Sequence, residues 1–287
     1  YTNYVAPDYR YRRNGQVLGS AKQMTVDDQW KLMMDDRNLQ SDRLRTTIVA
    51  ALKDDPAQRD LAALLEKWDG VDRADQAAPL VYQAMYREVA LGTFTNKLGE
   101  DAAKDMLSTW YFWQQRFDAL VATPDSPWFD NPETKDKRET LADVIRTAAP
   151  RARASIETLQ GKDPAAWAWG KAHTLSFVSP LRRSGAGQEL AGGFTVQRPG
   201  SGETLNRGVY DFQKPFAVNF FPSMRVVVDF ADPDKINAVV AGGVSERHFQ
   251  PHQNDQARIL VAGERRSWWF NPKQVEAHAK SRATLSP

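Results

Sequence analysis

The stretch that decides the fold reads RPGSGETLNRG at residues 198–208, and PSMRVVVDF follows it at residues 222–230. From about residue 175 onward, glycines cluster and β-branched and aromatic residues alternate, a pattern typical of strands joined by tight turns. The predicted strands are 216–221, 224–230, 239–240 and 259–261. The C-terminal part of the chain is therefore predicted to form sheet.

Three consecutive valines, Val226 to Val228, indicate a strand that is buried on both faces. So small a set of strands does not supply the layers that would cover both faces. The pattern therefore favours a partner chain that completes the sheet.

The residues before 175 carry apolar side chains at helical spacing, as in Leu44, Ile48 and Leu52. Helices are predicted from residue 25, with Thr25 as cap, through 44–52 and 61–68, over 79–88, 101–121 and 137–158, from residue 163, and over 272–280. Residues 122–136 are predicted to form a surface loop. In the helix predicted over 101–121, the stripe of Met106, Trp110, Trp113 and Phe117 is expected to be core.

Composition is that of an ordinary globular chain with an excess of tryptophan. The 38 basic and 36 acidic residues nearly cancel, so nothing in the charge points to a nucleic-acid partner. The absence of cysteine excludes disulfides and thiolate metal sites. The nine tryptophans are expected to build core or interface.

No apolar run reaches the roughly 18 residues that a membrane span needs. Residues 1–20 lack a signal-peptide pattern, and YTNYVAPDYR at 1–10 reads like sequence from the middle of a protein. We therefore expect no membrane span and expect further polypeptide before Tyr1.

The histidines give no convincing metal site. His248 and His252 are four residues apart with Asp255 beyond them, but Pro251 between them disfavours a helical pair of ligands. A hydrogen-bonding loop histidine is the better interpretation. His173 is expected at a helix end, in a structural role.

Nucleophilic chemistry is equally unsupported by the residues alone. The sequence has no Gly-x-Ser-x-Gly elbow, and no P-loop lysine follows Gly200-Ser201-Gly202. The segment 200–202 is therefore predicted to be a surface turn.

Several motifs in fixed order nevertheless carry a family resemblance. They are Arg10 followed by MTVDDQW at 24–30, LLEKWDG at 64–70, WGKAH at 169–173, SPL at 179–181, the 198–208 stretch, HFQPHQNDQ at 248–256, WWF at 268–270 and KQVEAH at 273–278. In this order they resemble the C-terminal part of the β chain in the penicillin acylase family of N-terminal-nucleophile hydrolases. Ser179 stands where many members have histidine, so the role of that histidine does not transfer.

The resemblance implies an α+β fold that is part of an αββα sandwich. Family members cut themselves into an α chain and a β chain, and the new N-terminal serine of the β chain attacks the substrate amide. Its own α-amino group serves as base, because such a group titrates near neutrality. An asparagine and backbone amides hold the oxyanion. Residue 1 is Tyr1, so serine and asparagine are both expected before this chain begins.

The resemblance carries one site residue onto this chain directly. Arg10 matches the family arginine that supports the oxyanion asparagine and the base, a task that suits a rigid and permanently charged guanidinium. The alternative is that Arg10 pairs with a surface carboxylate. By the same alignment, Asn3 and Tyr4 fall near the acyl-binding pocket. We expect no cofactor or metal on this chain, because the calcium of several members is held mostly by residues before its start.

The sequence thus predicts the C-terminal portion of an amidohydrolase that cleaves N-acyl amides such as penicillin, with residues 1–174 mainly helical and 175–287 strand-rich. The expected partners are the α chain, the N-terminal part of the β chain and a small N-acyl amide, and the expected location is periplasmic or secreted. One alternative is an acyl-homoserine lactone acylase. Another is a non-catalytic peptide- or glycan-binding module, which would fold alone and expose several tryptophans in one groove.

Overall fold

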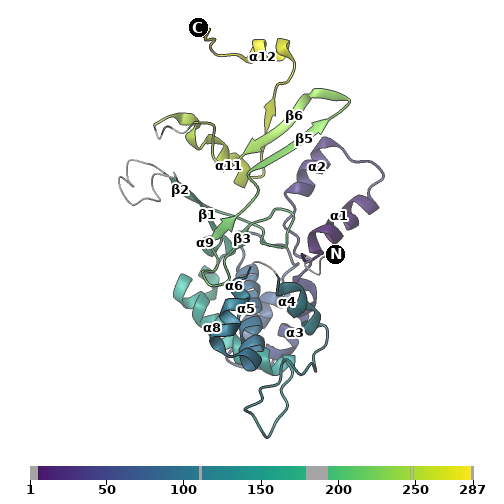
Figure 1. Cartoon of the computed structure of the whole chain (residues 1–287), viewed down its shortest axis with the longest axis vertical. Helices are drawn as coiled ribbons and strands as arrows, with labels where there is room; N and C mark the ends of the chain where they lie inside the picture. The colour runs from purple at the N-terminus through teal and green to yellow at the C-terminus, as the bar shows by residue number, and fades with distance from the viewer. Residues whose placement is uncertain (1–5, 110–111, 179–192, 246, 248, 286–287) are drawn as a thin grey trace. The chain divides into compact units, whose positions relative to one another are not determined.

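The computed structural model describes residues 6–109, 112–178, 193–245, 247 and 249–285, and it is drawn in Figure 1. The chain divides into two compact units that interleave along the sequence. Unit 1 comprises Tyr1–Gly19, Asp35–Ser176 and Thr195–Phe221, and unit 2 comprises Ser20–Met34, Phe177–Phe194 and Pro222–Pro287. Helices and strands are both present, which confirms the α+β class.

Unit 1 is built mainly from helices. They are α1 (Tyr9–Ser20), α3 (Ser41–Leu52), α4 (Arg59–Glu66), α5 (Ala77–Leu98), α6 (Glu100–Ser108), α7 (Gln114–Val121), α8 (Leu141–Gln160), the 3-10 helix η1 (Pro164–Ala166) and α9 (Trp169–Ala172). The central helix is α5, which packs against α4, α6 and α8 and is buried along most of its length. The helices predicted from Leu44 and from Leu61 are confirmed as α3 and α4.

The core of unit 1 follows from aromatic residues along α5 and small apolar residues along α8. Tyr82 lies 5.5 Å from Trp68 between ring centroids, and Tyr86 meets Phe117 edge-on at 5.2 Å. The buried face of α8 includes Ile145, Ala148, Ala149, Ala152 and Ile156, whose spacing of three and four residues keeps them on one side of the helix. These small side chains let α8 lie close to the crowded face of α5.

The single helix predicted over 101–121 is wrong. The structure has two helices there, α6 and α7, and the backbone leaves the helical region at Thr109. The β-branched Thr109 and the aromatic residues after it have low helix propensity, which explains the break. Trp113 and Phe117 are buried, as predicted, and Trp110 lies outside the described residues.

A small sheet with the strand order β2-β1-β4-β3 lies mostly in unit 1. Its strands are β1 (Thr174–Phe177), β2 (Phe194–Gln197), β3 (Val209–Tyr210) and β4 (Val218–Phe220). Strand β4 runs parallel to β1 and antiparallel to β3. The strand predicted over 216–221 is therefore real but shorter. The loop 198–208 joins β2 to β3, so the sheet fixes both ends of that loop.

Unit 2 contains α2 (Val26–Met33) and a three-stranded antiparallel sheet in the order β5-β6-β7. The remaining elements are β5 (Met224–Asp229), β6 (Asp232–Val240), β7 (Arg266–Trp268), the 3-10 helix η2 (Pro251–Gln253), α11 (Asp255–Val261) and α12 (Pro272–His278). Thr25 and Asp28 form the expected capping box of α2. The indole N–H of Trp30 donates to the carbonyl of Gly263 at 2.7 Å, which ties α2 to the rest of unit 2.

One prediction for unit 2 is wrong. Residues 259–261 belong to helix α11 and not to a strand, because Ala257 and Leu260 bury one helical face behind an acidic first residue, Asp255. Val226 and Val228 of β5 are each 38% exposed, so this chain alone does not cover the valine run, and the partner chain expected to cover it stays a prediction. The side chains of β5 alternate between the two faces, as in an ordinary half-buried strand.

The order of elements along the chain agrees with the change of pattern near residue 175, since the first strand, β1, begins at Thr174. The assignment of 1–174 and 175–287 as two regions of a larger core stays a prediction. Among the described residues, no helix has the length and apolar composition that crossing a bilayer requires.

Candidate functional site

The loop 198–208 is buried, so the predicted surface turn at 200–202 is wrong. Ser201 is 1% exposed and Thr204 is completely buried. Gly200 has a φ of +76°, and a Cβ at this position would lie 2.2 Å from the carbonyl oxygen of Asn206. Glycine is required here because any side chain would collide with the returning backbone of the same loop.

Polar contacts from unit 1 hold this loop. The side chain of Asn206 donates to Asp36 at 2.9 Å and accepts from Arg198 at 2.8 Å. The backbone N–H of Gly200 donates to the carbonyl of Asp72 at 2.8 Å. A loop this polar becomes stable inside a protein only when its groups are paired, and these contacts supply much of that pairing.

Asp72 is the first of three carboxyl groups in this region, of which two are buried and one is half-buried. It is completely buried and accepts a hydrogen bond from Asn38 at 3.0 Å. Burial raises the pKa of Asp72 to about 7, although hydrogen bonds from Ser201 and Asn38 oppose the rise. The hydrogen bonds of Asp72 are therefore structural, and the one from Ser201 supports the 198–208 loop.

Glu203 is the second buried carboxyl group and the one with charged neighbours. It is 5% exposed, and burial raises its pKa to about 8, while the positive charges of Arg10 and Arg207 act in the opposite direction. The Oε2 atom of Glu203 and the Nε atom of Arg10 are buried without a hydrogen-bond partner among the described residues. The structure thus brings Arg10 of α1 into the electrostatic range of a buried acid on the 198–208 loop.

Neighbours on α1 fix the position of Arg10. Tyr9 donates to the carboxylate of Asp118 at 2.8 Å, and Arg13 forms an ion pair with Asp35 at 2.6 Å. These two contacts hold α1 within unit 1 on both sides of Arg10. The backbone of α1 at Arg10 is therefore held in place within unit 1.

Asp118 of α7 is the third carboxyl group of this region, and it is half-buried. It accepts from Tyr9, from Tyr86 at 3.0 Å and from Gln40 at 3.3 Å. Burial raises the pKa of Asp118 to about 6 despite these three hydrogen bonds. Through Asp118, the position of α1 depends on α5 and α7.

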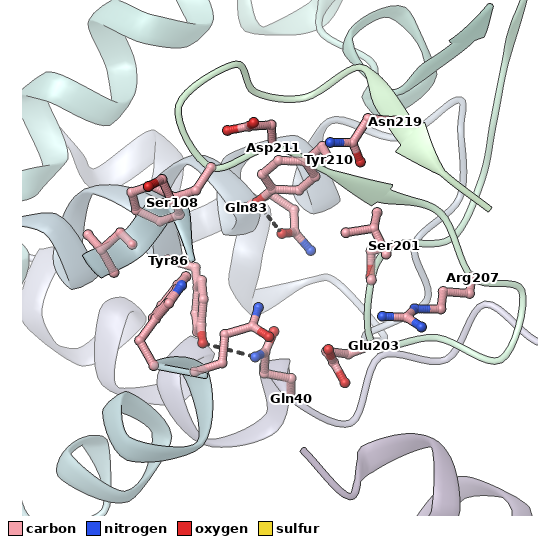
Figure 2. A pocket seen from close by; sticks show the side chains of 16 residues that line it. Gln40, Gln83, Tyr86, Ser108, Ser201, Glu203, Arg207, Tyr210, Asp211 and Asn219 are labelled. Atoms are coloured by element: carbon pink, nitrogen blue, oxygen red, sulfur yellow. Dashed lines mark hydrogen bonds between the residues drawn. The ribbon is translucent and has the colours of Figure 1, made fainter. Parts of the chain in front are cut away.

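A pocket of roughly 130 Å³ lies beside Glu203 in unit 1. Figure 2 shows Gln40, Gln83, Glu203 and Arg207 around the same space, with Tyr86 and Tyr210 among its walls. The amide of Gln40 donates to Tyr86 at 3.0 Å, and the hydroxyl of Tyr210 donates to Gln83 at 2.9 Å. The polar groups of the pocket are therefore held in place by one another.

Of the residues predicted from the sequence to serve the site, only Arg10 can be placed. Asn3 and Tyr4 lie outside the described residues, and so do His248 and Ser179. His252 lies in unit 2, where it pairs with Asp255 at 3.0 Å. Within the described part of the chain, no three histidine, aspartate or glutamate side chains gather as metal ligands.

His173 is a core residue at the end of α9. It is completely buried, its Nδ1 donates to the carbonyl of Phe216 at 2.9 Å, and its ring stacks on Trp169 at 4.4 Å between centroids. Burial lowers the pKa of His173 to about 3, so the ring is neutral at physiological pH. These contacts agree with the structural role expected from its place at a helix end.

These three acids were missed in the sequence analysis. Glu203 stands inside the quoted 198–208 stretch, but its neighbours are small and polar, so no apolar pattern marks it as buried. Asp118 follows Phe117 on a helix, and the sequence pattern predicts a solvent-exposed side chain there. The only usable signal was the unusual density of glycine and small polar residues around Glu203, which accompanies close backbone packing.

Comparisons with known proteins identify the family of this chain. The family described as penicillin amidase matches residues 1–277. Acyl-homoserine lactone acylase QuiP from Pseudomonas fluorescens is 27% identical over 238 residues, and QuiP from Pseudomonas aeruginosa is 28% identical over 241 residues. The matches cover 80% and 78% of this chain but only 28% of each relative.

A solved structure gives the fold. The thermostable penicillin G acylase from Alcaligenes faecalis aligns with a TM-score of 0.61 and 16% identity, over 99% of this chain and 54% of that chain. The present chain thus has the fold of a large part of a penicillin acylase chain and spans less than a third of the curated relatives it matches. By the family match over nearly its whole length, this chain belongs to the penicillin amidase family.

Proposed function

We propose that this chain is the C-terminal portion of the β chain of an acylase that hydrolyses N-acyl amides to a carboxylic acid and an amine. The nucleophile would be an N-terminal serine on polypeptide that precedes this chain. The observation that carries the proposal is the family match over residues 1–277, and the buried Glu203, on which the charge of Arg10 acts, supports it. The remaining chains of the same precursor are the proposed partners.

Arg10 would orient the oxyanion-binding asparagine and the base, and Glu203 would orient Arg10. A buried acid next to a guanidinium holds that guanidinium in one position, and fixed dipoles stabilise a developing oxyanion without reorganising during the reaction. Arg10 is in this sense a positioning residue. No cofactor is proposed on this chain, any calcium is proposed to lie on residues outside it, and the location proposed from the family is periplasmic or secreted.

The substrate class has two candidates, penicillin-type side chains and acyl-homoserine lactones. The relatives named as acyl-homoserine lactone acylases are 27–28% identical to this chain. This likeness favours acyl-homoserine lactones. Asn3 and Tyr4 are proposed to line the acyl pocket in either case.

The third hypothesis, a binding module, predicts a groove of exposed tryptophans. Trp30, Trp68, Trp113, Trp167 and Trp169 are buried instead. Among the described tryptophans, those with more than a third of their surface exposed are Trp128 in unit 1 and Trp269 in unit 2. This distribution gives the binding-module hypothesis no support.

The test uses the complete protein that carries this chain. Mass spectrometry under denaturing conditions should find companion chains, one of which begins with serine. Release of free amine is then measured from penicillin G and from acyl-homoserine lactones of increasing acyl length. A protein that contains this chain alone and releases amine from neither substrate would overturn the proposal.

Variants separate the site role of Arg10 from a role at the surface. Arg10→Ala should lower kcat about 100-fold, because the groups it orients would lose their alignment. Arg12→Ala is the matched control, since Arg12 lies on the same helix, is half exposed and pairs with Asp8. Equal activity of the two variants would show that Arg10 is only a surface residue.

A further inference from the structure

Helix α1 contacts the rest of unit 1 along one face. The structure describes α1 over its whole length, and none of its residues is buried. Tyr9, Arg10 and Arg13 are half-buried, whereas Tyr11 and Arg12 are exposed. Residues three and four positions apart lie on the same side of a helix, so the three half-buried residues share a face. Because α1 buries no apolar side chain, its position depends mainly on the polar contacts of this face.

Asp118 of α7 joins this face to the core of unit 1. Its Oδ2 accepts from the hydroxyl of Tyr9 at 2.8 Å and from Gln40 at 3.3 Å. Its Oδ1 accepts from Tyr86 at 3.0 Å, and Gln40 also donates to the hydroxyl of Tyr86 at 3.0 Å. Tyr86 belongs to α5 and is only 3% exposed. The carboxylate is therefore held by the core on one side and by α1 on the other.

The protonation states of the two partners strengthen this contact. Burial, and after it the charge of Asp118, raises the pKa of Tyr9, so the hydroxyl keeps its proton and donates. Burial raises the pKa of Asp118 to about 6, and the hydrogen bond from Tyr9 opposes this rise more than those from Gln40 and Tyr86 do. At neutral pH the carboxyl is ionised, and hydrogen bonds to an ionised group are roughly twice as strong as neutral ones.

Arg10 lies between two such contacts on α1. Tyr9 precedes it, and the ion pair of Arg13 with Asp35 at 2.6 Å follows one turn later. The guanidinium of Arg12 lies 4.8 Å from the centroid of the Tyr9 ring, so the ring is held as well as the hydroxyl. The place of Arg10 therefore depends directly on the contact of its neighbour with Asp118.

We infer that Asp118 is a positioning residue, which holds the first turn of α1 through Tyr9 and thereby keeps Arg10 in range of Glu203. Its effect on the reaction rate rests on the proposed function, in which Arg10 orients the oxyanion asparagine and the base. Asp118 acts through Arg10 and is not proposed to contact the substrate.

A role of Asp118 in the core alone would need only its contacts with Tyr86 and Gln40. Tyr9→Phe separates the two roles, because it removes the hydroxyl that reaches Asp118 from α1 and leaves the contacts of Asp118 with α5 and Gln40 in place. Tyr11→Phe is the matched control, since it makes the same change on the same helix at a residue that is 80% exposed.

Release of amine by the complete protein measures the effect on the reaction. Tyr9→Phe should lower kcat about tenfold with little change in KM, the lower end of what a hydrogen bond to a charged group contributes. Tyr11→Phe should leave kcat unchanged. Asp118→Asn should lower kcat at least as much, and its matched control is Asp60→Asn, a half-buried aspartate of α4 that pairs with Arg153. Equal kcat in Tyr9→Phe and Tyr11→Phe would overturn the inference.

A double-mutant cycle tests whether Asp118 acts through Arg10. In the Arg10→Ala background, Tyr9→Phe should lower kcat by less than about twofold, because the residue it positions is already absent. A further tenfold loss in that background would mean that Tyr9 and Asp118 act independently of Arg10, and would contradict the assignment.

Hydrogen exchange gives a measurement that does not depend on activity. Backbone amides of α1 should exchange at least threefold faster in Tyr9→Phe than in the unaltered protein, and at an unchanged rate in Tyr11→Phe. Unchanged exchange in Tyr9→Phe would show that Asp118 does not hold α1. If the unaltered protein releases no amine, the proposed function fails, and the exchange of α1 still decides whether Asp118 fixes the helix that carries Arg10.

Discussion

Unit 1 and unit 2 bury their aromatic residues to very different degrees. Phe117 and Trp169 of unit 1 are completely buried, whereas Phe230 of unit 2 is 95% exposed and Phe249 is 88% exposed. Both units contain strands and helices, so secondary structure does not account for the difference. The units differ in how many elements cover their aromatic residues. In unit 1, α5 packs against α4, α6 and α8, whereas unit 2 has fewer elements to cover its sheet.

The comparison teaches that the two units depend on the rest of the protein to different extents. Unit 1 completes a core from its own helices. Unit 2 leaves Met224, Val226 and Val228 of β5 partly exposed in a row on one face of its sheet. An apolar row of this kind is typical of a surface that another polypeptide covers, in agreement with the proposed companion chains.

The largest expected effect comes from removing a tryptophan in each unit. Trp169→Ala should lower the free energy of unfolding of unit 1 by about 3–5 kcal/mol, because it leaves a cavity beside Tyr210 and Phe216. Trp269→Ala in unit 2 should cost less than about 1 kcal/mol, since Trp269 is 39% exposed. Urea unfolding followed by peptide-resolved hydrogen exchange measures both, and similar losses would abolish the contrast.

A smaller effect is expected from the buried loop. Asn206→Ala removes hydrogen bonds to Asp36 and from Arg198, both charged, and should destabilise unit 1 by about 2–3 kcal/mol. Asn271→Ala in unit 2 removes only the exposed cap of α12 and should cost about 1 kcal/mol. If the two variants unfold at the same urea concentration, the loop does not stabilise unit 1.

The response to pH should have opposite signs in the two units. In unit 1, burial raises the pKa of Glu203 to about 8 and that of Asp72 to about 7. The folded state then binds protons that the unfolded state has lost, so unit 1 should lose stability between about pH 4.5 and 8, by roughly 1 kcal/mol per pH unit for each group. Because glutamine does not titrate, Glu203→Gln should reduce the loss of stability of unit 1 at the upper end of this pH range.

In unit 2, the pKa of Asp255 is lowered: burial alone would raise it, but hydrogen bonds and charges from His252 and Arg266 outweigh burial. Unit 2 should therefore keep this contribution above the ordinary value of 3.8 and lose it as the pH falls through the lowered value. Hydrogen exchange at pH 2.5, 4, 6 and 8, corrected for the pH dependence of intrinsic exchange and read separately for each unit, checks both signs. A shared direction in both units would contradict the assignment of buried acids to unit 1.

The smallest effect on stability should come from the exposed row of β5. Replacing Val226 and Val228 together by threonine should change the free energy of unfolding by no more than about 0.5 kcal/mol, since threonine keeps the β-branched shape. The same double variant should weaken retention of companion chains during size-exclusion chromatography. A stability loss above about 2 kcal/mol would mean that unit 2 buries this row itself.

Much of the helical part of the fold was predictable. The spacing of Leu44, Ile48 and Leu52 identified α3, and Thr25 with Asp28 identified the start of α2, because capping and periodicity act over a few residues. The family resemblance was equally local, since it rested on short motifs in order. The candidate site was not predictable in this way, apart from Arg10, because Asp118 bonds to Tyr9 and Glu203 lies in the electrostatic range of Arg10 across more than 100 residues of sequence.

The sequence by itself determined the helical first half, the change toward strands near residue 175, and the family. These depend on local propensity and on motifs, which a single chain carries in its residue order. Only the tertiary structure decided that 198–208 is buried, that 255–261 is a helix, and that Asp72 and Glu203 are buried in unit 1. The physical reason is that burial of a polar residue depends on partners such as Asp36 for Asn206, and those partners lie far away in the sequence.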